Sequence, residues 1–233
     1  MTFNLTKPDL ILLHGALGSQ AQFSELSKKL SSSFTIHTFN FSGYGGRPID
    51  QAPSIDYFSQ NLIDYIVEND LVSPFVFGYS MGGYVALNAR SIGIAMERLM
   101  TLGTKFAWTP EGAAKEIKLL NPEIIEVKVP HFATHLTALH APDDWKIVMR
   151  NTTQMMTFLG DNPPLTDEKL KNIELETLCC LGSNDTMVSR EETEHAVSQL
   201  GNGSLHIFEG MEHPIEKVDI AVLSAKIEDF FLS

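Results

Sequence analysis

Short apolar runs alternate along the chain with segments whose apolar residues recur at helical spacing. The run DLILLHG (9–15) places four consecutive apolar residues before a histidine and a glycine, which is typical of a strand buried on both faces. The segment 54–70 instead places Ile55, Phe58 and Leu62 on one helical stripe. The contrast predicts successive strand–helix units.

The same pattern extends over most of the sequence. Ser189 and Glu192 have the spacing of a capping box, which predicts a helix start, and 215–232 has the pattern of a closing amphipathic helix. The predicted strands are 9–15, 34–43, 74–80, 97–104, 175–185 and 203–210. Alternating units of this kind build a doubly wound α/β fold with a mostly parallel sheet of about six strands.

The alternation stops from about Lys105 to Asn172. This stretch contains helical patterns broken by prolines, and Thr109-Pro110 has the form of a helix N-cap followed by proline at the first helical position. We therefore expect a core made of 1–104 and 173–233, with a helical insertion at 105–172. Right-handed crossovers would bring the carboxyl ends of all strands to one edge of the sheet, where ligands bind in such folds.

A candidate nucleophile lies at the end of the third predicted strand. Ser80 stands in the pattern Gly78-Tyr79-Ser80-Met81-Gly82, between an apolar strand and a helical segment. In that context the pattern predicts a sharp strand–turn–helix that exposes the serine hydroxyl, with glycines where side chains would collide. The alternative is a plain glycine-rich turn.

A serine hydroxyl needs a base, and the base needs a carboxylate. His213 follows the last predicted strand, and Asp185 follows the penultimate one, so both would emerge at the same edge as Ser80. The order Ser80, Asp185, His213 is the order described for the α/β-hydrolases. The alternatives are a solvated loop histidine and an aspartate that only forms a turn.

Two backbone N–H groups are predicted to form the oxyanion hole. Met81 follows the nucleophile directly, and the loop after the first strand, HGALGS, should supply the second donor from Ala16, with Leu17 next in order. The alternative is that His14-Gly15 simply closes a strand.

These motifs occur in the order of a known family. The chain resembles the α/β-hydrolase fold superfamily, in its branch of compact serine hydrolases with a helical lid, over nearly its whole length. The matching stretches are His14-Gly15 with Gly18, NFSGYGGRP (40–48), GYSMGG (78–83), LGSNDTMVS (181–189) and GMEHPIEKV (210–218). The resemblance implies that 105–172 is a lid over Ser80 and that no cofactor is required.

The chain departs from the family pattern at two places. The loop that usually reads Asp-x-Pro-Gly-x-Gly-x-Ser is Asn40 to Arg47 here, which affects inferences about the substrate entrance. The N-terminal hairpin common in the family is expected to be missing.

An apolar pocket is expected beneath the lid. Its predicted lining is Leu17, Tyr79, Trp108, Trp145 and Met149, and the lid also offers Phe106, Met155, Met156 and Phe158 as candidates. The alternative is that most of these lid residues form the lid's own core.

Charge and cysteine content narrow the partners. A formal net charge of -12 disfavours nucleic acid and anionic membranes. Cys179 and Cys180 are adjacent in an apolar run, so we expect free core thiols facing opposite sides of a strand rather than a disulfide. His131 and His135 are four residues apart, but no clear further ligand follows, so no metal site is expected. The N-terminus lacks a signal-peptide pattern, which favours a cytoplasmic protein.

The leading hypothesis is a serine hydrolase that cleaves a small carboxylic ester and acts as a monomer or weak homodimer. A second hypothesis keeps the triad but assigns a carbon–carbon bond hydrolase or a cofactor-free lyase, for which Arg47 or Arg90 is the candidate cation. A third is a ligand-binding protein of the same fold without activity.

Overall fold

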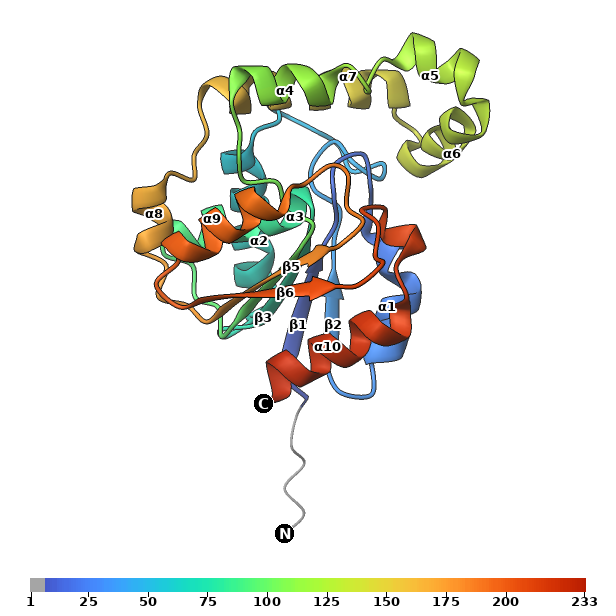
Figure 1. The fold of residues 1–233 in the computed structure, drawn as a ribbon. Helices are drawn as coiled ribbons and strands as arrows, with labels where there is room; N and C mark the ends of the chain where they lie inside the picture. Colours follow the sequence, from blue (N-terminus) through green and yellow to red (C-terminus); the bar gives the residue numbers. More distant parts are fainter. Residues whose placement is uncertain (1–6) are drawn as a thin grey trace.

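The computed structural model describes residues 7–233, and a central parallel sheet organises them (Figure 1). The sheet order is β2-β1-β3-β4-β5-β6, with every neighbouring pair parallel. The strands are β1 Asp9–Leu13, β2 Thr35–Thr38, β3 Phe75–Tyr79, β4 Leu99–Leu102, β5 Thr177–Gly182 and β6 Gly203–Phe208. The helices are η1 Gln20–Phe23, α1 Ser24–Leu30, α2 Ile55–Glu68, α3 Met81–Ser91, α4 Pro110–Ile117, α5 Pro122–Lys128, α6 Pro130–His140, α7 Trp145–Asp161, α8 Asp167–Lys171, α9 Arg190–Gln199, η2 Ile215–Lys217 and α10 Ile220–Leu232. The predicted α/β class with a six-stranded sheet is confirmed.

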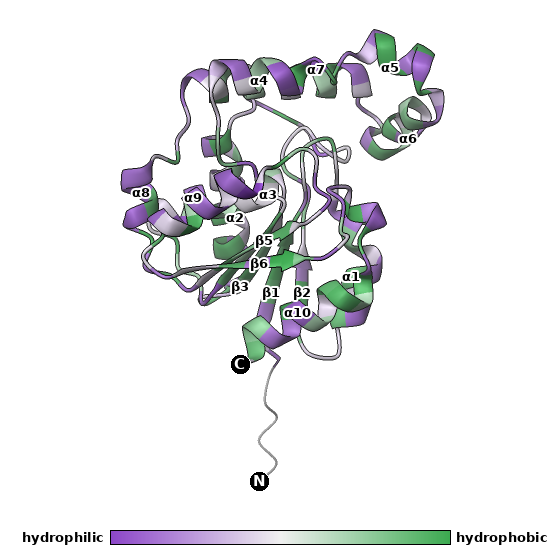
Figure 2. Ribbon diagram, viewed as in Figure 1, coloured by the Kyte–Doolittle hydropathy of each residue, from purple (hydrophilic) through white to green (hydrophobic). Residues whose placement is uncertain are grey.

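Helices cover both faces of the sheet because successive strand residues point in opposite directions. In β1, Leu10 and Leu12 belong to one apolar cluster with residues of α1 and α10, whereas Ile11 and Leu13 belong to another with residues of α2 and α3. Both sets are fully buried. Figure 2 shows the apolar strands between these helix layers.

The two cysteines follow the same alternation. Cys179 lies in the cluster with α2 and α3, and Cys180 lies in the cluster with α1 and α10. Both are free and buried, as predicted. Burial raises the pKa of Cys179 to about 11, so this thiol stays protonated at neutral pH.

The segment 105–172, called the helical segment below, contains α4 to α8 and joins β4 to β5. In Figure 1 helices α4 to α7 lie beyond the carboxyl edge of the sheet. The predicted cap is present: Thr109 accepts a hydrogen bond from the N–H of Gly112, and Pro110 is the first helical residue.

Two predicted elements have different limits in the structure. The strand expected at 34–43 ends at Thr38, because the next backbone groups bond to side chains: the N–H of Phe41 donates to His14 and the N–H of Ser42 donates to Asn61. The helix expected at 215–232 begins at Ile220, because Asp219 caps it by accepting from the N–H groups of Ala221 and Val222. A short 3-10 turn precedes it.

Within residues 7–233, no helix combines the length and the apolar character that crossing a bilayer requires.

Candidate active site

Ser80 lies on a sharp turn between β3 and α3, as its sequence pattern predicts. Its φ of 51° and ψ of -116° fall in a strained region for a residue with a side chain. The surrounding backbone fixes this turn: the Ser80 N–H donates to Leu102 O at 2.8 Å, and the Thr104 hydroxyl donates to Ser80 O at 3.0 Å. The serine hydroxyl is thereby held at the start of a helix, where the helix dipole favours negative charge.

The glycines flanking Ser80 are required by space. A Cβ on Gly78 would lie 2.4 Å from Gly83 N, and a Cβ on Gly82 would lie 2.3 Å from Leu13 O. Both contacts are with backbone atoms, which cannot rotate away from the added Cβ as a side chain could. Any larger residue at either position would force the turn away from the sheet.

The structure brings the three predicted triad side chains together. His213 Nε2 lies 3.3 Å from Ser80 Oγ, and His213 Nδ1 lies 2.7 Å from Asp185 Oδ2. The Asp185 carboxylate accepts a hydrogen bond from Nδ1–H, which leaves Nε2 to accept a hydrogen bond from the serine hydroxyl. His213 and Asp185 have only 8% and 1% of their side-chain surface exposed, so their interaction is shielded from water.

Asp185 is held in its charged form. Burial alone would raise the pKa of this carboxyl, but the hydrogen bond and charge of His213, with the N–H groups of Val188 and Met187, outweigh burial and hold the pKa below its ordinary value. The two backbone bonds reach Oδ1 at 2.9 and 2.8 Å, while Oδ2 faces His213. One oxygen is fixed by the chain and the other orients the imidazole.

The loop expected to supply the second oxyanion donor is fixed by a buried histidine. His14 Nε2 accepts the Phe41 N–H at 3.1 Å, so its Nδ1 carries the proton and donates to Gly15 O at 2.8 Å. Burial lowers the pKa of His14 to about 4, which keeps the ring neutral. Ala16 follows this anchor and lines the space beside Ser80. The assignment of Ala16 and Met81 as donors stays a prediction.

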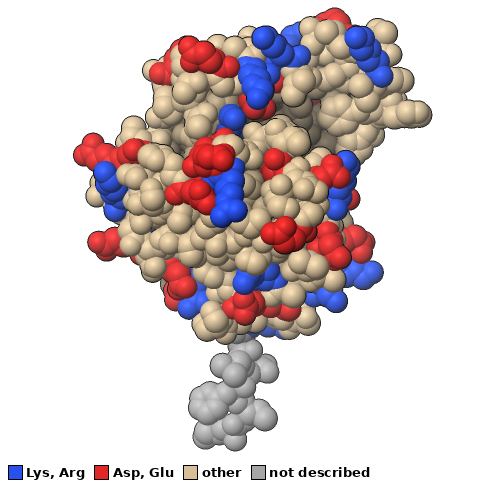
Figure 3. Space-filling model, viewed as in Figure 1, with Lys and Arg blue, Asp and Glu red and all other residues tan. Residues whose placement is uncertain are grey.

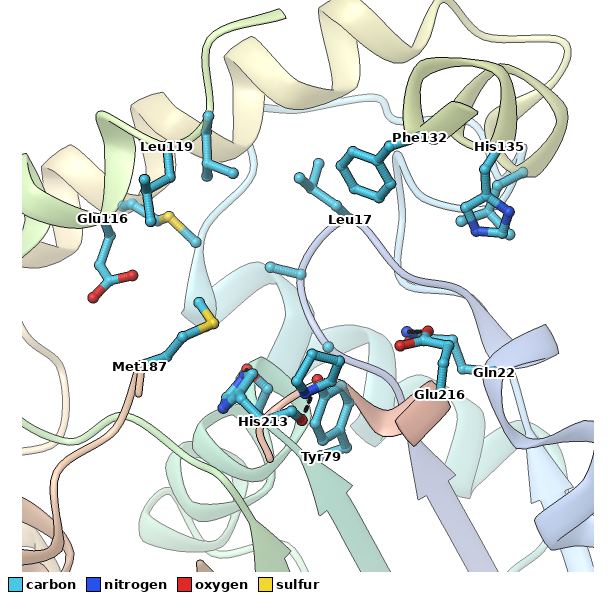
Figure 4. Close-up of a pocket in the computed structure, with 17 residues that line it drawn as sticks. Leu17, Gln22, Tyr79, Glu116, Leu119, Phe132, His135, Met187, His213 and Glu216 are labelled. Carbon is cyan, nitrogen blue, oxygen red and sulfur yellow. Dashed lines mark hydrogen bonds between the residues drawn. The ribbon is translucent and has the colours of Figure 1, made fainter. Parts of the chain in front are cut away.

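Two cavities meet at Ser80. The larger, about 330 Å³, is bordered by Ser80, His213, Leu17 and Tyr79 among others (Figure 4). The smaller, about 50 Å³, is bordered by Ser80, Met81 and Trp108 among others. Leu17, Tyr79 and Trp108 thus lie where a pocket lining was predicted. Figure 3 shows that the surface is hollowed beneath the helical segment.

Two predicted pocket residues lie elsewhere. Trp145 and Met149 are buried in a separate cluster with Ile125, Ala133 and Leu136, inside the helical segment, and line neither cavity. The pocket assignment of these two residues is corrected accordingly. They lie on the stripe of α7 that faces α5 and α6, whereas Met155 and Met156, further along α7, reach the smaller cavity.

Several residues near the site were not found from the sequence. Gly103 has a φ of 60°, and a Cβ there would lie 3.1 Å from His213 Nδ1, so a side chain would crowd the imidazole. Glu116 and Glu216 line the larger cavity, and Lys105 lines the smaller. Gly103 directly follows a strand, which is a usable signal. The charged residues carried no motif.

The described residues contain no group of three or more histidine, cysteine or carboxylate side chains arranged to hold a metal ion. His135 lines the larger cavity, and His140 instead accepts the N–H of Gly45 at 3.1 Å.

Comparisons with known proteins identify the family to which the sequence is similar. A family model described as "Alpha/beta hydrolase family" matches residues 10–217. A pimeloyl-[acyl-carrier protein] methyl ester esterase from Aromatoleum aromaticum is 35% identical over 114 residues, covering 47% of this chain and 43% of that protein. An sn-1-specific diacylglycerol lipase, ABHD11, from Mus musculus is 28% identical over 131 residues, covering 54% and 43%. The matched stretch is thus less than half the length of these curated relatives.

Solved structures extend the likeness over the whole fold. MenH from S. aureus superposes with a TM-score of 0.77 at 19% identity, covering 97% of this chain and 94% of that one. A putative lipase from Acinetobacter baumannii superposes with a TM-score of 0.80 at 17% identity, covering 97% and 84%. At these identities the likeness concerns the fold.

Proposed function

The chain belongs to the alpha/beta hydrolase family, and from that premise we propose that it is a serine hydrolase that cleaves a small carboxylic ester. The observation that carries the proposal is the hydrogen-bonded series from Ser80 Oγ through His213 to Asp185. The names of curated relatives, which include methyl ester esterases and a diacylglycerol lipase, support ester chemistry.

The proposed reaction proceeds through an acyl-enzyme. Ser80 Oγ attacks the ester carbonyl while His213 Nε2 takes the hydroxyl proton, and the N–H groups of Met81 and Ala16 stabilise the oxyanion. The carbon–oxygen bond to the alcohol then breaks, and His213 gives its proton to the leaving oxygen. Water, deprotonated by His213, attacks the acyl carbonyl. The bond to Ser80 Oγ then breaks, His213 returns its proton to Oγ, and the acid is released. Asp185 holds the imidazole and stabilises its charged form throughout.

We also propose that the two parts of the chain have different roles. Residues 1–104 and 173–233 act as the hydrolase core, and 105–172 acts as a lid whose helices supply cavity walls. Trp108, Met155 and Met156 from this segment all border the smaller cavity beside Ser80, which supports the assignment.

The carbon–carbon hydrolase or lyase alternative is less well supported. Its substrates carry carboxylates, for which a free cation near the site is expected, but Arg47 donates to Asn40 O and Arg90 to Ile94 O, and neither lines a cavity. Lys105 does line the smaller cavity but already lies 3.4 Å from Glu116 and 3.9 Å from Glu192. The non-catalytic alternative leaves the alignment of Ser80, His213 and Asp185 without a purpose.

The test is hydrolysis of acetate and butyrate esters by the protein and by two serine variants. Ser80→Ala should lower kcat by about 10⁴-fold or more, because it removes the nucleophile. Ser91→Ala, at the far end of the same helix, is the matched control and should keep wild-type turnover. Equal turnover by Ser80→Ala and the wild type would refute the assignment, and turnover of vinylogous diketones or enolpyruvyl compounds alone would favour the alternative.

A further inference from the structure

The two cavities that meet at Ser80 differ in their position relative to His213. Ser80 and Ala16 line both cavities, but His213 lines only the larger one and Met81 only the smaller one. The general acid must protonate the leaving alcohol oxygen, so the alcohol has to lie on the His213 side. The acyl chain then extends from the same carbonyl carbon into the smaller cavity, past Met81.

The smaller cavity limits the acyl group by volume. At about 50 Å³ it has room for about two carbons beyond the carbonyl, given that one water occupies about 30 Å³ of liquid. Ile55, Met155 and Leu159 form its end, and the same three side chains border another small cavity beyond it. These side chains are therefore a partition, and they stop a longer chain from passing through.

The larger cavity limits the alcohol by charge. Its wall includes the apolar side chains of Leu119, Phe132 and Met187, together with the carboxylates of Glu116 and Glu216 (Figure 4). Among the described residues that line it there is no arginine or lysine. An anionic alcohol would thus enter a space with carboxylates and no facing cation, which is costly in a partly enclosed site.

The two carboxylates are not equivalent. Glu116 lies 3.4 Å from the ammonium group of Lys105, which offsets part of its charge. Glu216 accepts a hydrogen bond from the uncharged Gln22 amide at 2.9 Å, and the described residues place no cation in an ion pair with it. Glu216 therefore keeps a charge that no ion pair among the described residues offsets, on an exposed side chain.

We infer, on the basis of the proposed esterase function, that the substrate is an ester of a short acyl group with a larger, mostly apolar alcohol that is neutral or cationic. The smaller cavity selects the acyl length, and the Glu116–Glu216 cavity selects the charge of the alcohol. Leu159 and Glu216 are the residues through which each selection can be changed.

Charge selection is tested with three acetates of similar size. Acetylcholine is cationic, 3,3-dimethylbutyl acetate is its neutral analogue of the same shape, and 3-sulfopropyl acetate is anionic. We expect kcat/KM for the cationic and neutral esters to exceed that for the anionic ester by about tenfold or more. Glu216→Gln should reduce this ratio, mainly through KM, whereas Glu168→Gln, which removes an exposed charge on α8, should not.

Acyl selection is tested with acetyl, butyryl and octanoyl esters of 3,3-dimethylbutanol. Wild-type kcat/KM should fall by about tenfold or more from butyryl to octanoyl, since one misplaced methylene already costs that order of discrimination. Leu159→Ala should restore octanoyl turnover, because it would join the smaller cavity to the neighbouring cavity on the other side of Leu159. Leu136→Ala, a buried truncation in α6 that lines neither cavity, controls for general loosening and should leave the preference unchanged.

The outcomes separate this inference from the proposed function. Hydrolysis of the neutral acetate with no preference for charge or chain length, or with a preference for anionic or octanoyl esters, would overturn the inference alone. A wild-type protein that hydrolyses none of the esters and resists fluorophosphonate labelling would overturn the proposed function, and the inference with it.

Discussion

Two regions meet at Ser80 and are held in different ways. At the sheet edge, Ser80 and Asp185 are fixed by hydrogen bonds to backbone, such as Ser80 N–H to Leu102 O and Val188 N–H to Asp185 Oδ1, and Asp185 in turn holds His213. The helical segment joins the core through side-chain contacts, such as Tyr44 Oη to Thr152 Oγ1 at 2.8 Å. The difference indicates that the reacting groups depend on the fold itself, whereas the cavity walls depend on replaceable side chains.

The sharpest way to test this contrast uses two histidine–aspartate pairs. His213–Asp185 is buried at the sheet edge, whereas His195–Asp167 links α9 to α8 at a similar 3.0 Å but has 59% and 56% of its side chains exposed. His213→Ala should lower kcat by about 10⁴-fold or more, because Ser80 loses its base. His195→Ala should leave kcat within about twofold, because exposed pairs contribute little. Initial-rate assays of ester hydrolysis measure kcat for both variants.

The second largest effect is expected at the carboxylate. Asp185→Asn keeps the shape of the side chain but cannot hold the imidazole in its working tautomer or stabilise its charged form, so kcat should fall by about 10²- to 10⁴-fold. The fall should appear in kcat rather than KM. Asp167→Asn is the matched change in the exposed pair, and an equal fall in both variants would contradict a specific role for Asp185.

The sequence predicts these residues because of where strands end. Ser80, Asp185 and His213 each follow a buried apolar run, and parallel strands bring their carboxyl ends to one edge. The alternation of β1 and the split of Cys179 and Cys180 between two clusters follow from the two-residue period of a strand.

The helical segment is less predictable for a physical reason. A stripe at helical spacing, such as that of α7, identifies a buried face but not which neighbouring helix covers which part of it. Trp145 and Met149 therefore lie in the internal cluster of the helical segment, whereas Met155 and Met156 line the smaller cavity. Glu116 and Glu216 carry no local pattern, and only the fold places them on opposite parts of one wall.

A smaller difference is expected in how far a glycine-to-alanine change in each region lowers the free energy of unfolding. Gly82→Ala would push a Cβ to 2.3 Å from Leu13 O and should destabilise the protein by about 3 kcal/mol. Gly112→Ala in α4 meets its nearest atom at 3.3 Å and should change the free energy of unfolding by about 1 kcal/mol or less. Urea unfolding compares them, and similar losses in both would contradict the claim that backbone contacts control the sheet edge.

The smallest expected effect is a pH dependence at the loop of Ala16. Burial holds the pKa of His14 at about 4 in the folded protein. As the pH falls below about 6.5, His14 is therefore protonated in the unfolded state but still neutral in the folded state. Stability is thus fully present above pH 6.5 and declines by about 2 to 3 kcal/mol toward pH 4. Urea unfolding across this range measures the slope.

The neighbouring groups define the control for that slope. His140, whose pKa burial also lowers, adds to it in the same direction, and Asp185 contributes only at lower pH because its pKa lies below the ordinary value. His14→Gln should flatten the slope, while His195→Ala should not. An unchanged slope in His14→Gln would show that the loop histidine is not the titrating group.

The proposed function requires that Ser80 is a nucleophile activated by His213. Treatment with a fluorophosphonate, followed by peptide mass spectrometry, tests this most directly because the reagent reports the activated serine itself. We expect one modification, on Ser80, that persists in His195→Ala and is lost in His213→Ala. A protein that stays unmodified, or one modified on Ser80 equally well without His213, would contradict it.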